Sequence, residues 1–201
     1  MRIFIFRFII PKIALRDLPP MLFISFVGAA VAGAYGILHD QITYTLSPEY
    51  FTKLKFHQFD YADFGFSERV FAAEIGFLAT WWVGLFAAWF LARRVLPNQP
   101  RARAYRQITI GFAIVVACAL SAGCLGYVIG ACRGPVAADS AWHSVLTSLN
   151  VEDRQAFIRV AYIHNGSYLG GLFGLLVALR IFKPDKSTES DTARSGDQNS
   201  R

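Results

Sequence analysis

Four long apolar blocks dominate the hydrophobic pattern of the chain. They cover residues 18–38, 70–92, 108–131 and 160–182. The first and third blocks contain no histidine and no charged residue, the second contains Glu74, and the fourth contains His164 and Arg180. Each block has about the 20 residues that a helix needs to cross a hydrocarbon core of about 30 Å. Because the blocks are apolar on every side, whereas barrel strands alternate, we predict four transmembrane helices.

Lys and Arg are distributed unequally among the segments that flank these blocks. The segment 1–17 carries four of them, and the segment 93–107 carries five Arg and no acidic residue. The segment 39–69 instead carries three basic residues and five acidic ones. Since cytoplasmic loops are enriched in Lys and Arg, we expect both termini in the cytoplasm. We interpret residues 1–17 as a cytoplasmic amphipathic segment and residues 183–201 as a disordered cytoplasmic tail.

Composition supports a membrane protein and limits the classes of partner. The chain has 201 residues, of which 54% are hydrophobic and 17% charged, with a net charge of +6. These proportions exclude disorder for most of the chain. The positive charge follows the loops in the way that membrane topology requires, so we expect the lipid bilayer and not a nucleic acid as partner.

Small residues recur at every fourth position in three of the blocks. The packing stripes that we predict are Gly28, Ala32, Gly36; Ala122, Gly126, Gly130; and Gly166, Gly170, Gly174. Residues four apart share a helix face, and small residues let helix backbones approach closely in lipid. The predicted fold class is therefore an all-α integral membrane protein, a four-transmembrane-helix bundle at residues 18–182.

The two outer segments carry their own helix signals. Ser47, Pro48 and Glu49 form a helix start, which predicts a short interfacial helix from residue 48 to about residue 58. Asn150 is predicted to cap the last helix. An unbroken helix from there to residue 182 would be about 48 Å long, so we expect it either to protrude from the membrane or to break at Asn165-Gly166.

Several polar residues fall at a similar predicted depth near the outer face. This candidate cluster contains His39, Asp40, Glu74, Arg133, His164 and Asn165. Within it, His39, Glu74 and His164 are candidate metal ligands of the two-His, one-carboxylate type, or a proton-handling group. Structural hydrogen bonds or ion pairs are the favoured interpretation, because Glu74 lies close enough to the interface to pair with a neighbouring arginine.

Sequence motifs add no catalytic or cofactor assignment. The three cysteines lack CxxC spacing, and no P-loop, dinucleotide fingerprint, GxSxG or HExxH motif is present. The runs HDQITYTLSPEYFTKLKF, ATWWVG and YIHNGSYLGG resemble a group of uncharacterised multi-pass bacterial inner-membrane proteins. The resemblance implies a location in the bacterial inner membrane and implies no activity.

The function expected from these features is that of a structural or accessory subunit. It would act through helix–helix and outer-surface contacts, in a larger membrane complex or a homo-oligomer. The alternatives are a small transporter or channel, and a membrane enzyme with an outer-face His/Glu metal site. The enzyme alternative requires His39, Glu74 and His164 to converge.

Overall fold

The computed structural model describes residues 13–133 and 142–182 of the chain. These described residues form helices and no strand. The predicted tail, and all but the last five residues of the predicted N-terminal segment, lie outside the described residues.

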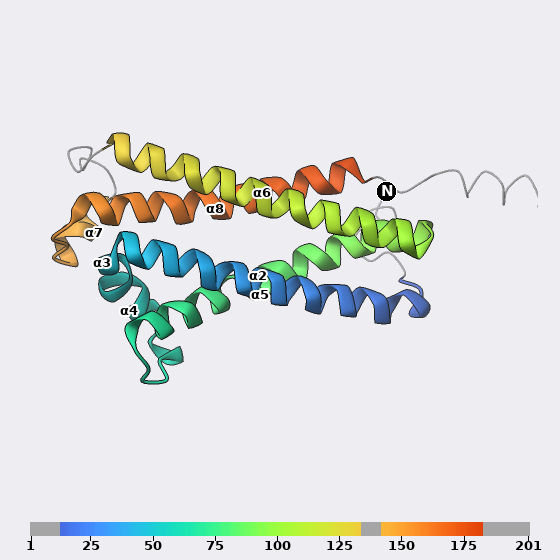
Figure 1. The fold of residues 1–201 in the computed structure, drawn as a ribbon, viewed down its shortest axis with the longest axis horizontal. Coiled ribbons are helices and arrows are strands. Elements are labelled where there is room, and N and C mark those ends of the chain that lie inside the picture. Colours follow the sequence, from blue (N-terminus) through green and yellow to red (C-terminus); the bar gives the residue numbers. More distant parts are fainter. Residues whose placement is uncertain (1–12, 134–141, 183–201) are drawn as a thin grey trace, which may run out of the picture.

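Four long helices form the body of the described part, and Figure 1 shows them aligned along one axis. They are α2 (Leu18–Leu46), α5 (Glu68–Val95), α6 (Arg101–Arg133) and α8 (Arg154–Ile181). The shorter elements are η1 (Leu15–Asp17), α3 (Pro48–Tyr50), the π-helical turn η2 (Phe51–Lys55), α4 (Phe56–Gln58), η3 (Asp60–Ala62), η4 (Leu96–Asn98) and α7 (Trp142–Ser148). We call the end with residues 47–67 and 142–153 the capped end, and the end with residues 93–106 and 180–182 the basic end.

Three helices of the described part are long and apolar enough to cross a membrane. They are Leu15–Leu46, Glu68–Val95 and Arg101–Arg133. The fourth long helix, α8, has 28 residues but is not in this set. The structure is thus all-helical with three candidate spans, whereas the sequence predicted four.

The long helices pack as two pairs, α2 with α5 and α6 with α8. Glycines set the close approach within each pair. A β-carbon on Gly36 of α2 would collide with the carbonyl oxygen of Gly76 on α5. In the second pair, a β-carbon on Gly126 of α6 would collide with the carbonyl oxygen of Tyr162 on α8. The small-residue stripes therefore lie where two backbones meet, as close helix packing in lipid requires.

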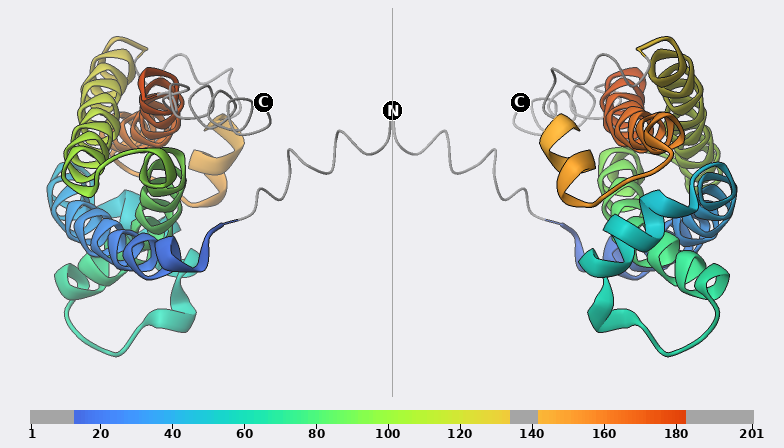
Figure 2. Two further views of the ribbon diagram at one scale, coloured as in Figure 1. Left: turned by 90° about the vertical axis from the view of Figure 1, so that its right-hand side faces the viewer. Right: turned by 90° about the vertical axis from the view of Figure 1, so that its left-hand side faces the viewer.

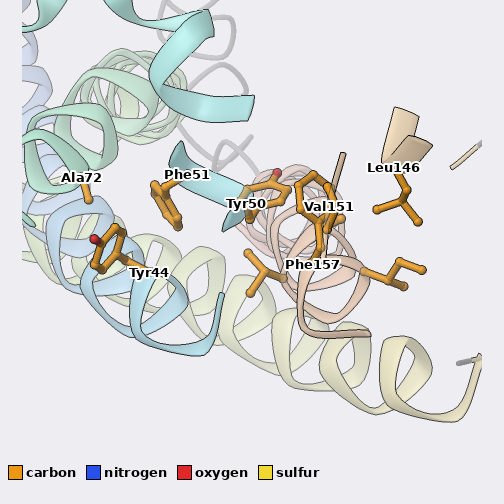
Figure 3. Packing of buried hydrophobic residues seen from close by; sticks show 10 residues of the cluster. Tyr44, Tyr50, Phe51, Ala72, Leu146, Val151 and Phe157 are labelled. Carbon is orange, nitrogen blue, oxygen red and sulfur yellow. The ribbon is translucent and has the colours of Figure 1, made fainter. Parts of the chain in front are cut away.

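Two buried apolar clusters, one at each end, join the two helix pairs. The capped-end cluster contains Tyr44, Tyr50, Phe51, Ala72, Leu146, Val151, Phe157, Ile158, Val160 and Ala161, and Figure 3 shows its aromatic rings packed together. The basic-end cluster contains Met21, Leu91, Ala92, Val95, Leu96, Ala104, Ile108 and Ala178. The glycine contacts lie mainly within each pair, so the burial of these side chains is what holds one pair against the other.

The last long helix differs from its prediction in two details. Its cap is Asp153, whose Oδ1 accepts a hydrogen bond of 2.9 Å from the Ala156 N–H. Asn150 instead lies before the helix with a φ of 49°, a left-handed conformation that asparagine tolerates. Of the two alternatives, protrusion or a break at Asn165-Gly166, the break is absent: Gly166 packs against the Ala122 backbone and α8 continues to Ile181.

The segment that follows α2 begins as the sequence predicted. Ser47 caps the turn, because its hydroxyl accepts a hydrogen bond of 3.4 Å from the Tyr50 N–H. Residues 48–58 are helical throughout, with the π-helical turn η2 in the middle. Residues 59–67 then project from the four long helices in Figure 2, and they expose Tyr61, Phe64 and Phe66.

Candidate metal centre

His39 and Asp40 lie inside helix α2, not at its end. The apolar block of the sequence stops at residue 38, but α2 continues to Leu46. The Thr43 hydroxyl, one turn further on, donates to the His39 carbonyl at 3.0 Å. Asp40 is only 4% exposed. The extra turns of α2 therefore bury a carboxylate at the capped end, next to a half-buried imidazole.

His164 approaches the same point from helix α8 and is 2% exposed. Its Nε2 atom lies 3.9 Å from Oδ1 of Asp40. Its ring meets the ring of His39 edge to face, with centroids 4.9 Å apart. One ligand atom from each of His39, Asp40 and His164 can be chosen such that all three lie within 4.8 Å of one another. We call this group the His/Asp cluster.

Aromatic rings surround the two imidazoles. Tyr50 stacks on His164 with centroids 5.0 Å apart, and Phe51 and Tyr168 lie about 6.1 Å from the same ring. Tyr35 stacks on His39 at 5.6 Å. Because these rings pack against both imidazoles, they restrict the side-chain rotamers and shield the cluster from water.

One ring nitrogen of each imidazole lacks a hydrogen-bond partner among the described residues. Nε2 of His39 and Nε2 of His164 are both buried, and neither has a hydrogen-bond partner among the described residues. The 3.9 Å separation of His164 Nε2 from Asp40 is too long for a hydrogen bond. Leaving a buried polar group unpaired costs about 1–3 kcal/mol, so two such atoms beside one carboxylate need an explanation.

Lys55 supplies the positive charge next to the cluster. Its Nζ atom lies 5.9 Å from the centroid of Tyr50, the ring that stacks on His164. Burial lowers the pKa of Lys55, and attraction to Asp40 partly opposes this shift. The cluster and Lys55 together thus bring one carboxylate, two imidazoles and one ammonium group close to one another.

A polar clamp holds the capping segment onto the start of α8. The Glu49 carboxylate accepts hydrogen bonds from the backbone N–H groups of Glu152 at 3.1 Å and Asp153 at 2.7 Å. Lys53 pairs with Glu49 at 2.5 Å and donates to the carbonyl of Asn150 at 2.6 Å. Burial alone would raise the pKa of Glu49, but Lys53 and the two N–H groups hold it below its ordinary value. This clamp fixes Tyr50 over His164.

The His/Asp cluster has the donors of a transition-metal site and a spacing slightly wider than a bound ion requires. Imidazole and carboxylate bind zinc and iron, and two ligands about 2.0–2.2 Å from one ion can be at most about 4.4 Å apart. The largest separation of 4.8 Å would therefore need side-chain shifts of about 1 Å to close on an ion. Coordination through Nε2 would also satisfy both unpartnered nitrogens.

The other residues of the predicted outer-face cluster lie elsewhere. Asp40, not Glu74, completes the group with the two histidines. One carboxylate oxygen of Glu74 is buried and has no hydrogen-bond partner among the described residues. Arg133 donates to the Tyr162 hydroxyl at 3.1 Å, and Asn165 is exposed.

Sequence reasoning missed the parts of this site that come from the capping segment. Tyr50 and Lys55 were not among the candidate residues, although both belong to the helix predicted after Ser47. A usable signal was the run 41–46, which has no charged residue and lets α2 continue past His39 and Asp40. That continuation turns a helix-end carboxylate into a buried one.

Fold and site together define an all-helical protein with three candidate membrane-spanning helices and a buried His/Asp cluster at one end. No family model, curated protein or solved structure matches the chain.

Proposed function

We propose that this chain is a four-span inner-membrane protein that binds one divalent transition-metal ion, zinc or iron, through His39, Asp40 and His164. The observation that carries the proposal is the convergence of one ligand atom from each of His39, Asp40 and His164, beside two buried imidazole Nε2 atoms that have no hydrogen-bond partner among the described residues. Both termini would lie in the cytoplasm and the metal near the outer face.

The length and pairing of α8 support a fourth span. At 1.5 Å per residue its 28 residues extend about 42 Å, more than the hydrocarbon thickness. It packs along α6, itself a candidate span, through close glycine contacts. Leu169, Leu172 and Phe173 are exposed, as expected of a face that contacts lipid.

Fusions of a periplasm-active reporter would test this topology. Reporters joined after residue 60 and after residue 148 should be active, and one joined after residue 98 should be inactive. A three-span protein would reverse the side of the C-terminus, so a reporter after residue 182 separates the two arrangements.

Metal binding is tested on the full chain in detergent, stripped with a chelator and titrated with Zn²⁺ or Fe²⁺ under equilibrium dialysis. We expect one ion per chain. Loss of outer-shell partners typically costs 10–100-fold in metal affinity, so removing a ligand by His39→Ala or His164→Ala should cost about 100-fold or more.

The chain offers matched controls for these variants. His57 and His143 are exposed and lie outside the cluster, so His57→Ala and His143→Ala should bind metal normally. Circular dichroism would show that each variant keeps its helices. The metal proposal would be overturned if the ligand variants bound metal as tightly as the wild type, or if the control variants lost as much affinity as the ligand variants.

An accessory role is the second candidate function, and the exposed aromatic segment 59–67 favours it. Tyr61, Phe64 and Phe66 are 65–75% exposed on a segment that projects from the bundle. Purification of the native protein in a mild detergent should then recover a larger complex, and Phe64→Ser should weaken it. Recovery of a bare monomer would refute this role.

A further inference from the structure

A groove opens at the basic end, far from the His/Asp cluster. It has a volume of about 620 Å³, and its walls are Arg94 of α5 with Val177, Arg180 and Ile181 of α8. A second hollow of about 470 Å³ shares both arginines and adds Leu176 and Leu179. Ligand sites commonly have volumes of this size. The basic end therefore has an apolar groove with two guanidinium groups at its edge.

Arg94 is held in place across the two helices. Its Nε donates a hydrogen bond of 3.2 Å to the carbonyl of Phe182, which follows the last residue of α8. This contact occupies a free carbonyl at the helix C-terminus, where a cation is favourable. It uses Nε and leaves the terminal Nη groups as donors, since Arg94 makes no other hydrogen bond among the described residues.

Charge and shape together select the class of ligand. Arg94 and Arg180 can bind phosphate oxygens in bidentate fashion, and the exposed side chains of Leu176 and Ile181 offer apolar surface next to them. An acidic group joined to an acyl chain meets both requirements. A free phosphate would use only the arginines, and a neutral lipid would use only the apolar wall.

We propose that this groove binds an anionic phospholipid, with the headgroup phosphate between Arg94 and Arg180 and an acyl chain along Leu176 and Val177. The proposal rests on the proposed placement of α5 and α8 in a membrane, and it is independent of the metal. It also agrees with the predicted cytoplasmic position of this end, where anionic lipids attract basic residues.

Native mass spectrometry of the full chain tests the proposal. The protein is purified in detergent with an equimolar mixture of phosphatidylglycerol and phosphatidylethanolamine. We expect the wild type to retain phosphatidylglycerol in preference. Since a basic residue near the surface contributes about 1 kcal/mol, Arg94→Ala and Arg180→Ala should each lower that preference about fivefold.

Two further arms separate the sources of phosphate binding and the role of the groove. Val177→Trp keeps both charges but fills the apolar wall, so it should also reduce retention of phosphatidylglycerol. Excess inorganic phosphate should not displace the lipid, and displacement by phosphate would show an anion site without an acyl-chain groove.

Arg103→Ala is the matched control, because Arg103 lies in the same basic region but does not line the groove. It should keep the wild-type preference. Unchanged preference in the groove variants, or an equal loss in Arg103→Ala, would overturn the proposal. If the protein were soluble without detergent, that result would refute the proposed membrane placement. The lipid preference of the variants tests the groove, so the two failures can be distinguished.

Discussion

Glu49→Gln tests whether the clamp between the capping segment and α8 holds the site closed. The substitution keeps the size of the side chain but removes its charge. Glu49 accepts two hydrogen bonds from backbone N–H groups, at 3.1 Å from Glu152 and 2.7 Å from Asp153, and it pairs with Lys53. We therefore expect the start of α8 and the segment over His164 to separate more often.

The magnitude follows from the contacts that are lost. Hydrogen bonds to a charged acceptor contribute about 1.5–3 kcal/mol, and the exposed i,i+4 pair adds only about 0.3–0.5 kcal/mol. Because the Glu49 side chain is 21% exposed and glutamine retains part of the hydrogen bonding, we expect a loss of about 1–2 kcal/mol. This corresponds to about 5- to 30-fold more frequent opening.

Hydrogen exchange of the Glu152 and Asp153 amides measures that opening directly. Glu49→Gln should speed their exchange and leave the middle of α6 unchanged. The matched control is Glu152→Gln, because the Glu152 side chain is exposed and takes no part in the clamp. Wild-type exchange in Glu49→Gln, or faster exchange in the control, would refute the clamp.

The clamp should also depend on pH in a definite direction. The pKa of Glu49 is lower in the folded protein than in an unfolded chain, where it is about 4.3. The charged carboxylate therefore stabilises the fold above that unfolded value, and the contribution is lost as the pH falls through the lower folded pKa. Amide exchange corrected for its intrinsic rate should rise in acid for the wild type and stay flat for Glu49→Gln.

Three further predictions concern the helix pairs and the charge beside the candidate metal centre. Gly170→Ala should lower the free energy of unfolding in denaturing detergent by about 1–3 kcal/mol, because its β-carbon would clash within the α6–α8 pair. The control Gly171→Ala should not change it, since the nearest atom to its β-carbon is 3.9 Å away. Thr80→Val removes the hydroxyl that lies 2.8 Å from the carbonyl oxygens of both Ala32 on α2 and Gly76 on α5, and it should cost about 0.6 kcal/mol in the same assay. Lys55→Met should raise Zn²⁺ affinity about tenfold in equilibrium dialysis, because it removes a repulsive charge worth about 1–2 kcal/mol. Equal effects of both glycine variants, no effect of Thr80→Val, or unchanged affinity in Lys55→Met would contradict the respective argument.

The helical fold and the close-packing stripes were within reach of sequence reasoning because both depend on local periodicity. Apolar blocks about 20 residues long predict helices whatever their neighbours are. Small residues four apart predict a face that can approach another backbone, and Gly36 and Gly126 lie at such contacts. Neither pattern says which helix supplies the other backbone.

The composition of the candidate metal centre was harder to predict because it depends on contacts between distant parts of the chain. His39 and His164 were both candidates, but Glu74 was chosen over Asp40 as third ligand because Glu74 lies inside a predicted span, whereas both were placed at a similar depth. Depth does not fix the rotation of a helix or the distance at which α2 ends. Once α2 continues to Leu46, its charged residue Asp40 turns toward α8 and becomes the carboxylate of the group.

The position of the His/Asp cluster gives the proposed metal a structural consequence. Close glycine–backbone contacts hold α2 to α5 and α6 to α8, whereas between the pairs Gly111 of α6 meets the side chain of Leu91 on α5, toward the basic end. His39 and Asp40 belong to the first pair and His164 to the second, so an ion bound by all three would cross-link the pairs. Lys55 and the Glu49 clamp lie on the segment that covers this junction. Metal occupancy would thus oppose the separation of the two helix pairs at the capped end, while the apolar cluster keeps them together at the basic end.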